Sequence, residues 1–161
     1  MPLLGPGDTF PSLGLPQVGG GSFTLPDVLG GRYGVVLFYR GSWCPYCNAQ
    51  LRAFQRAADS LAGIGAAVVA LSVDDETTTA QLIAKHGLTF LLGHSADAQA
   101  ISAATDAFVD PTGCFLQSAG FVLDPSGRVI VSVYSSGAIG RLVPEDVVGL
   151  VRYLRDHATT S

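Results

Sequence analysis

The stretch that decides the fold is VVLFYRGSWCPYCNAQLRAF, residues 35–54. Residues 35–39 are a continuous β-branched and aromatic run, which is typical of a strand buried on both faces of a parallel sheet. From about residue 45 to residue 62, apolar side chains recur at helical spacing with charged side chains between them. The pattern predicts a buried strand that leads into a helix through a turn containing Cys44 and Cys47.

The rest of the chain alternates in the same way. We expect further strands at 66–73 and 89–92, helices over 74–87, 97–104 and from 144 onward, and a late hairpin of 121–123 with 129–134 around the turn Asp-Pro-Ser-Gly. Two short apolar pieces near the start, within 10–15 and 22–25, flank QVGGGS and predict a small hairpin. These elements indicate one three-layer α/β domain over residues 1–161, with a mixed central sheet and an N-terminal β-hairpin extension.

Composition excludes several classes of protein. Charged residues make up 14% of the 161 residues and the net charge is −4, so neither disorder nor a nucleic-acid surface is expected. No apolar run approaches the roughly 18 residues needed to span a bilayer, and the first residues do not resemble a signal peptide. We therefore expect a soluble cytoplasmic protein with no membrane or nucleic-acid partner, in which a close cysteine pair is catalytic or binds a metal.

The cysteine pair is placed for redox chemistry. Cys44 falls at the strand-to-helix turn, Pro45 suits the first helical position, and Cys47 lies within the first turn. Residues three apart on a helix are close enough for a disulfide. The positive end of the helix favours a thiolate and lowers its pKa, and Arg40 is near enough in sequence to lower it further. A reactive, reversibly oxidised dithiol follows.

Other interpretations of the pair stay open. A zinc site needs about four ligands, and the remaining candidates show no ligand spacing: Cys114, His86, His94 and His157. We therefore expect no metal and no cofactor, with inert core cysteines as a further alternative. Trp43 either fills the core or shapes the site, and Tyr46 is expected to be a supporting residue of the site.

The sequence resembles a known family at several points. WCPYC after a strand is similar to the active site of the thioredoxin and glutaredoxin superfamily. GDTFPSLGLP, VVLFYRGSWCPYCNAQL and FVLDPSGRVIVSVY resemble the N-terminal strand, the active-site segment and the late hairpin of the peroxiredoxin branch called the alkyl hydroperoxide reductase / thiol-specific antioxidant family. FYRGSWCPYC resembles its peroxiredoxin-like subgroup with a paired-cysteine site. The resemblance implies a thioredoxin-like fold.

The peroxiredoxin pattern P-x-x-x-T-x-x-C is only partly present. Without gaps, Arg40 stands where the family has proline, Cys44 where it has threonine, and Cys47 where it has the peroxide-attacking cysteine. The family's second arginine corresponds here to Ser118. Arg40 or Arg141 is a candidate to replace that guanidinium, although a solvated surface position is the favoured interpretation for both.

Two mechanisms compete for this site. In the first, Cys47 attacks a hydroperoxide and its sulfenic acid condenses with Cys44. In the second, a more exposed Cys44 attacks a protein disulfide and Cys47 resolves the mixed disulfide. We favour thiol-dependent peroxide reduction, with a thioredoxin-type or low-molecular-weight thiol as reductant, over disulfide exchange or a redox-sensing or metal-binding module. Cys114 is expected to be a buried apolar residue, with a resolving or intersubunit thiol as the alternative. The resemblance also implies a possible homodimer.

Overall fold

The computed structural model describes residues 3–157. Its central sheet has the strand order β5-β4-β3-β6-β7. Three strands run parallel, β3 (Tyr33–Phe38), β4 (Ala66–Leu71) and β5 (Leu91–Gly93). The other two continue the sheet in an antiparallel hairpin, β6 (Ala119–Leu123) and β7 (Val129–Tyr134). The mixed sheet and the late hairpin are as predicted.

Strand β3 is central because it can be buried on both sides. It is apolar from Val35 to Phe38, and none of these four side chains reaches solvent. Its two neighbours pair with it along almost its whole length, with Val36 opposite Val69 of β4 and Phe121 of β6. The segment that follows β3 is therefore anchored at the carboxyl end of a rigid strand.

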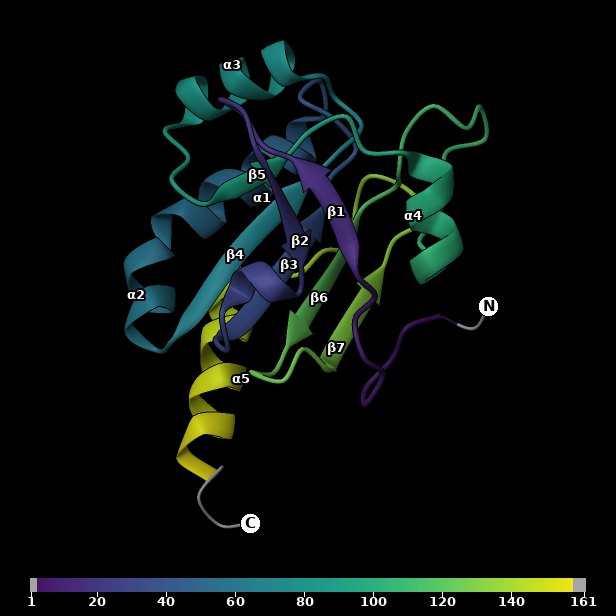
Figure 1. The fold of residues 1–161 in the computed structure, drawn as a ribbon. Helices are drawn as coiled ribbons and strands as arrows, with labels where there is room; N and C mark the ends of the chain where they lie inside the picture. The colour runs from purple at the N-terminus through teal and green to yellow at the C-terminus, as the bar shows by residue number, and fades with distance from the viewer. Residues whose placement is uncertain (1–2, 158–161) are drawn as a thin grey trace.

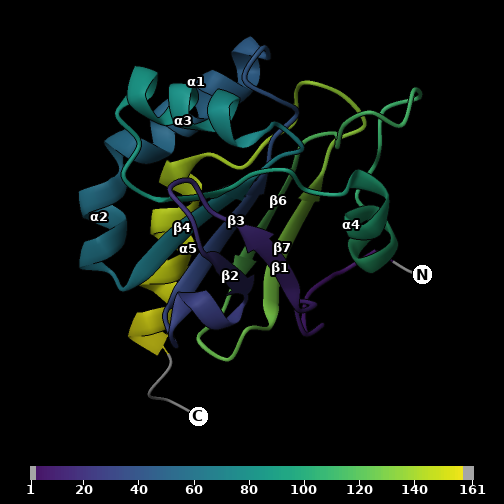
Figure 2. The same cartoon turned by 45° about the horizontal axis from the view of Figure 1, so that its top comes forward.

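Each face of the sheet carries its own layer. On one face, buried side chains of α1 (Pro45–Arg56), α2 (Ala58–Gly63), α3 (Glu76–His86) and α5 (Pro144–His157) pack against alternate residues of the strands. On the other face lie the 3₁₀ helix η1 (Asp27–Leu29), α4 (Ala98–Thr105) and the hairpin of β1 (Leu13–Pro16) with β2 (Ser22–Leu25). Figures 1 and 2 show this hairpin and α4 on the side of the sheet opposite α5. The three layers and the N-terminal hairpin match the sequence prediction.

One expected helix is in fact two. The helical pattern of residues 45–62 is interrupted at Ala57, whose φ of −91° and ψ of 5° end α1 and begin α2. Phe54 before the break and Leu61 after it are both buried in the same core cluster. Apolar spacing alone predicted one continuous helix because the step across the break still resembles a helical repeat.

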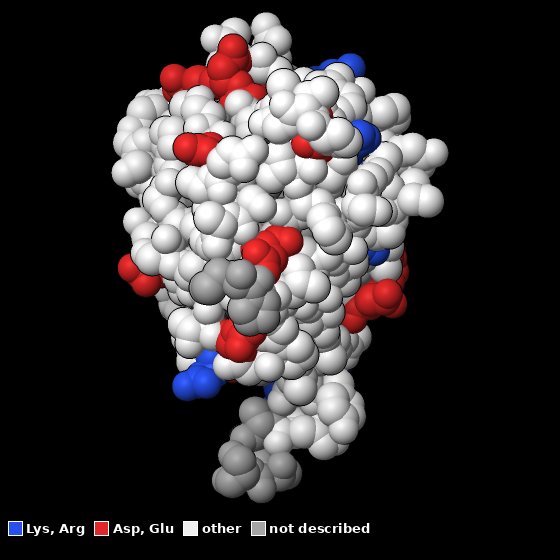
Figure 3. All heavy atoms as spheres, turned by 90° about the vertical axis from the view of Figure 1, so that its right-hand side faces the viewer, with Lys and Arg blue, Asp and Glu red and all other residues white. Residues whose placement is uncertain are grey.

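Helix α3 shows how local sequence sets helix ends. Asp75 caps its first turn by accepting a hydrogen bond from the Thr78 N–H, and Gly87 ends it in the left-handed region. Asp74, the residue before this cap, contacts the active-site turn instead, as described below. In the described residues no helix is long and apolar enough to cross a bilayer. Figure 3 shows a face on which acidic and basic side chains are scattered.

Candidate active site

The two cysteines lie where β3 gives way to α1. Cys44 is the residue that caps α1, in an extended conformation with φ −90° and ψ 114°, and its Sγ accepts a hydrogen bond from the Cys47 N–H at 3.4 Å. Pro45 occupies the first helical position of α1, where a backbone N–H would have no hydrogen-bond acceptor within the helix. The helix end therefore directs its unpaired N–H groups and positive dipole toward the two sulfurs.

Two arginines converge on these sulfurs. The Arg40 N–H donates to Cys47 Sγ at 3.2 Å, and the Nη2 of Arg141 donates to the same sulfur at 3.1 Å. Cys44 Sγ lies 3.7 Å from Arg40 Nη1 and 3.8 Å from Arg141 Nη2. Neither cysteine is exposed to solvent. A negative charge on Cys44 Sγ thus lies between two guanidinium groups, and one on Cys47 Sγ lies between the Arg141 guanidinium and the Arg40 backbone N–H, in a water-poor site.

The two thiols titrate as a pair. Burial opposes ionisation of Cys44, but hydrogen bonds from the thiol and backbone of Cys47 and the charges of Arg40 and Arg141 outweigh it and lower its pKa. Burial, and then the hydrogen bond to Cys44, raise the pKa of Cys47 despite Arg141. The first proton of the pair is therefore lost more easily than that of an ordinary thiol and the second is held more tightly, and Cys44 is the sulfur that favours the first negative charge.

Arg40 is itself held by a clamp of side chains. Its guanidinium lies over the ring of Trp43, 4.9 Å from the centroid, and over that of Phe115 at 5.2 Å. The two rings meet edge to face at 5.0 Å. The Nε of Arg40 donates to Gln117 Oε1 at 2.9 Å. These contacts fix the guanidinium beside Cys44, so Trp43 supports the site although it is 54% exposed.

Arg141 reaches the sulfurs from the segment before α5. Its Nη1 donates to Gln50 Oε1 at 2.8 Å, and its Nε donates to the Ala138 carbonyl at 2.7 Å. Gln50, which lies on α1, uses its amide to donate to the Leu142 carbonyl at 3.0 Å. The guanidinium is therefore oriented from both sides before any substrate arrives.

The predicted surface positions of Arg40 and Arg141 are wrong. Both are half-buried, because each donates a hydrogen bond beside the sulfurs: Arg40 to Gln117, which lies just before β6, and Arg141 to Gln50 of α1. The expectation that Cys44 is the more exposed sulfur is also wrong, since neither cysteine reaches solvent.

Cys114 and Ser118 differ from expectation in different ways. Cys114 is exposed rather than buried, because it sits in a loop turned by hydrogen bonds to the Asp110 carboxylate, including one from the Phe115 N–H. Its thiol contacts only the Thr112 carbonyl, at 3.8 Å. Ser118 is buried directly before β6, and its carbonyl accepts a hydrogen bond from the Ser135 N–H at 2.9 Å.

Sequence reasoning missed Phe115 and Gln117. Both belong to the segment 105–117, which lies between the predicted elements and in the structure has one isolated β-bridge, between Val109 and Leu116. The one available signal was their nearness to Ser118, where the family carries its second arginine.

Asp74 braces the turn that carries the cysteines. Its carboxylate accepts a hydrogen bond from the Ser42 N–H at 2.8 Å, and the Ser42 carbonyl accepts one from Asn48 Nδ2 at 3.0 Å. Burial raises the pKa of Asp74, and it raises that of the neighbouring Tyr39 to about 12, so the phenol stays neutral. Asp74 therefore does not cap α3; it ties the α3 end of the sheet to the active-site turn.

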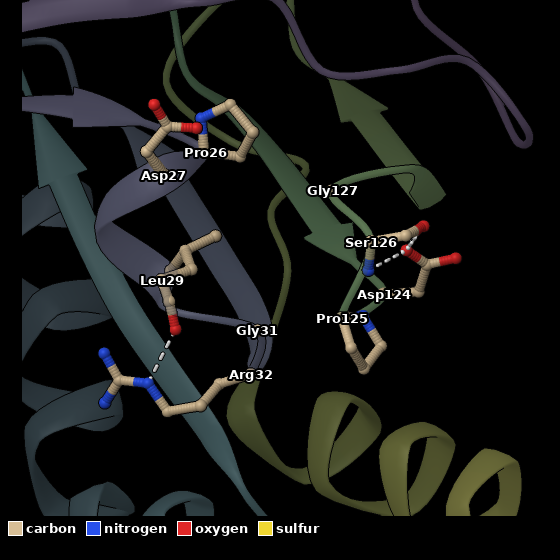
Figure 4. A pocket seen from close by; sticks show the side chains of 9 residues that line it. All are labelled: Pro26, Asp27, Leu29, Gly31, Arg32, Asp124, Pro125, Ser126 and Gly127. Atoms are coloured by element: carbon tan, nitrogen blue, oxygen red, sulfur yellow. Dashed lines mark hydrogen bonds between the residues drawn. The ribbon is translucent and has the colours of Figure 1, made fainter.

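A separate hollow lies far from the cysteines (Figure 4). It is formed where η1 meets the turn between β6 and β7, and its Arg32 and Asp124 bond to neighbouring protein atoms. Arg32 lies just before the start of β3, and Cys44 lies beyond its end. The six residues of β3, at about 3.3 Å each, place about 20 Å between these two ends. This hollow therefore takes no part in the cysteine chemistry.

The comparisons with known proteins agree with this geometry. A Mycobacterium tuberculosis protein whose name places it among the peroxiredoxins is 29% identical over 143 residues, covering 86% of this chain and 90% of the relative. A peroxiredoxin of Treponema denticola is 28% identical over 162 residues, covering 96% of this chain and 74% of the relative.

Solved structures share the fold. Peroxidoxin BcpB from Mycobacterium tuberculosis superposes with a TM-score of 0.81 at 20% identity, covering 94% of this chain and 98% of that one. Mycobacterium bovis AhpC superposes with a TM-score of 0.79 at 24% identity, covering 96% of this chain and 94% of that one. The thioredoxin-like fold is thus confirmed. The model of the AhpC/TSA family matches residues 6–132, which span the N-terminal hairpin, the cysteine turn and the late β-hairpin, and the chain therefore belongs to the AhpC/TSA family.

Proposed function

We propose that this protein is a thiol-dependent peroxidase that reduces hydroperoxides through a reversible Cys44–Cys47 disulfide. Membership of the AhpC/TSA family supports the reaction class. The observation that carries the proposal is the sulfur pair itself. Its two thiols lie next to each other at a helix N-terminus, and Arg141 Nη2 donates to Cys47 Sγ at 3.1 Å.

Burial favours a small oxidant over a protein disulfide. Disulfide exchange would require a partner's S–S bond to approach the reduced pair in line, and in this reduced form neither Cys44 nor Cys47 is exposed. A hydroperoxide group needs much less room. The lowered pKa of Cys44 suits either reaction, so access is the feature that separates them.

The proposed cycle begins with a proton shift and an attack. The Cys44 thiolate takes the proton of Cys47, and the resulting Cys47 thiolate attacks the outer oxygen of R–O–OH. The O–O bond breaks, Cys47 becomes a sulfenic acid, and the alkoxide leaves as ROH after taking a proton from Cys44. Arg141 donates to the oxygen on which charge develops.

Resolution then closes the disulfide. The Cys44 thiolate displaces hydroxide from the sulfur of the Cys47 sulfenic acid, and one proton from solvent converts that hydroxide to water. Two electrons have passed from the thiol pair to the peroxide. A thioredoxin-type or low-molecular-weight thiol reductant restores the dithiol by exchange at the disulfide.

The other site residues have supporting roles in this proposal. Arg40 stabilises the resting thiolate on Cys44, Pro45 starts the helix that carries the pair, and Trp43 keeps Arg40 in place. Tyr46, 55% exposed, lines the approach. Ser118 and Cys114 have no part in the cycle. A homodimer in the cytoplasm stays a prediction.

The test mixes reduced protein with hydrogen peroxide in a stopped-flow instrument and follows Trp43, the single tryptophan. We expect a concentration-dependent change much faster than the oxidation of a free thiol; a rate equal to that of a free thiol would refute peroxidase function. Sulfenic acid trapping in Cys44→Ser protein should label Cys47. A label found only on Cys44 of Cys47→Ser protein would reverse the two roles.

A further inference from the structure

The segment 108–117 folds back on itself as a small hairpin between α4 and β6. Three rungs join its two arms, pairing Phe108 with Gln117, Val109 with Leu116, and Asp110 with Phe115. The Gln117 N–H donates to the Phe108 carbonyl at 2.8 Å, and the Asp110 N–H donates to the Phe115 carbonyl at 3.0 Å. The arm that returns toward β6 is therefore ordered by the arm that precedes it.

The carboxylate of Asp110 ties the tip of this 108–117 hairpin. Its Oδ1 accepts a hydrogen bond from the Phe115 N–H at 2.9 Å. Its Oδ2 accepts one from the Thr112 N–H at 3.0 Å and another from the Thr112 hydroxyl. Asp110 is only 7% exposed, and although burial opposes its ionisation, these hydrogen bonds outweigh burial and keep its pKa below the ordinary value. The tip is thus held by an ionised carboxylate at neutral pH.

The returning arm of the hairpin holds Arg40. The ring of Phe115 faces the guanidinium of Arg40 at 5.2 Å, and Gln117 Oε1 accepts a hydrogen bond from its Nε at 2.9 Å. Both the N–H and the carbonyl of Phe115 bond to Asp110. On its other side, Arg40 places Nη1 at 3.7 Å from Cys44 Sγ. Contacts therefore run without a gap from the Asp110 carboxylate, through Phe115 and Arg40, to Cys44.

We propose that Asp110 is a positioning residue for the Cys44 thiolate and acts through Phe115 and Arg40. The inference rests on the proposed peroxidase function, in which the reduced pair carries its negative charge on Cys44. Asp110 keeps the 108–117 hairpin in the shape that sets the Phe115 ring against the guanidinium. It thereby favours the thiolate from outside the turn that carries the cysteines.

The flexibility of arginine explains why such support matters. A free arginine side chain samples many rotamers, and a guanidinium that does so spends little time beside any one sulfur. An aromatic face and an amide oxygen on one ordered arm keep the guanidinium of Arg40 in a single place. Without the Asp110 carboxylate, the rung that fixes Phe115 is weakened and this arm loses its order at the tip.

Only part of the stabilisation of Cys44 passes through the hairpin. Three groups face its sulfur: the guanidinium groups of Arg40 and Arg141, and Cys47, whose N–H donates to it. Arg141 is held instead by Gln50 of α1 and by the Ala138 carbonyl. Loss of Asp110 should therefore weaken the thiolate without abolishing it.

The test follows the ultraviolet absorbance of the thiolate between pH 5 and pH 9, with every variant made in Cys114→Ser protein so that only the pair is observed. We expect Asp110→Ala to move the first ionisation to higher pH. Oxidation by hydrogen peroxide should slow about three- to tenfold at pH 6 and change little at pH 9. Asp124→Ala is the matched control, because the Asp124 carboxylate accepts the same kinds of hydrogen bond in the turn between β6 and β7. It should keep the titration of the parent protein.

A second pair of variants tests the route to the sulfur. Phe115→Leu keeps an apolar side chain but removes the ring, and should shift the titration in the same direction as Asp110→Ala. Phe108→Leu, which replaces an exposed ring on the other arm, should leave it unchanged. In Arg40→Met protein, Asp110→Ala should add no further shift, because its effect passes through the missing guanidinium.

Three results would overturn the positioning role: an unchanged titration in Asp110→Ala, an unchanged titration in Phe115→Leu, or a shift by Asp110→Ala that persists in full in Arg40→Met protein. The last would assign the effect to a general loss of folding. Failure of the proposed peroxidase function has a different signature, because the titrations do not involve peroxide. They would shift as expected, while hydrogen peroxide oxidised the wild-type protein no faster than a free thiol.

Discussion

Replacing Arg141 by methionine removes one charge from the sulfur pair and keeps a side chain of similar length. At 3.1 Å and an effective dielectric constant of about 20, a guanidinium and a thiolate attract each other by about 5 kcal/mol. Loss of hydration by both groups offsets much of this, and hydrogen bonds to charged groups contribute a net 1.5–3 kcal/mol or so. Since about 1.4 kcal/mol is a factor of ten, Arg141→Met should slow peroxide attack about 10- to 150-fold at neutral pH.

The pH dependence of this effect identifies its cause. Without Arg141, the pKa of the thiol that ionises first should rise, because an opposite charge no longer favours the thiolate. The slowing should therefore be largest at low pH and smaller as pH rises and the thiolate forms without help. The part that persists at high pH measures the hydrogen bond to the peroxide oxygen.

The assay follows Trp43 fluorescence after mixing with hydrogen peroxide between pH 5 and pH 9. Arg152→Met, which removes an exposed arginine from α5, controls for the change in net charge and should behave as wild type. Arg141→Lys keeps the charge but not the planar pair of guanidinium donors, so its oxidation rate should fall between those of wild type and Arg141→Met. An Arg141→Met rate within threefold of wild type at every pH, or above it, would refute the reasoning.

Four further results are expected. Arg40→Pro should slow hydrogen peroxide oxidation more than Arg40→Ala, because alanine keeps the backbone N–H that donates to Cys47 Sγ and proline removes it; equal rates would deny that bond a role. Gln117→Ala should slow the same step about three- to tenfold, because the guanidinium of Arg40 loses the hydrogen bond that positions it. The pKa of the Cys44 thiol should rise at the same time, which a loss of folding alone would not cause. Burial raises the pKa of Asp74 above 3.8, so the folded state holds its proton more tightly than the unfolded state, and its contribution to stability falls as pH rises through the folded pKa. Asp74→Asn should therefore gain stability relative to wild type over that range in urea titrations at several pH values, and a constant difference would contradict this. Cys114→Ser should leave single-turnover oxidation within twofold of wild type, and a lost fast phase would show that Cys114 takes part.

Local signals account for most of what the sequence predicted. The run from Val35 to Phe38 is apolar on both sides of the strand, so both faces must be covered, and it forms the central strand of the sheet. Pro45 and Asp75 mark helix starts through contacts within one turn, so no distant part of the chain was needed to place them. Cys44 and Cys47 are neighbours for the same reason.

The remainder of the site depends on contacts that no local pattern contains. Arg141 lies 94 residues from Cys47 in the sequence, and Gln117 lies 77 residues from Arg40. A charged side chain is exposed by default, so an arginine that turns inward is visible only once its partner has been placed. The prediction for Cys114 was wrong in the opposite direction, since it was expected to be buried and is exposed. Small apolar residues are usually buried, but the turn at Asp110 holds this one at the surface.

The two departures from the peroxiredoxin motif compensate for each other. The family's proline has no N–H, whereas Arg40 in its place supplies one that donates to Cys47 Sγ at 3.2 Å. The family's threonine offers a hydroxyl, and Cys44 in its place gives up that strong donor but brings a second sulfur within reach of the first. Arg40 then adds a guanidinium beside the new sulfur, held there by Trp43 and Phe115. Exchanging only threonine for cysteine would leave Cys47 with one donor fewer and the new thiol beside one guanidinium, that of Arg141, instead of two. The two replacements together give a site in which the charge rests on one sulfur and the hydrogen bonds for attack converge on the other.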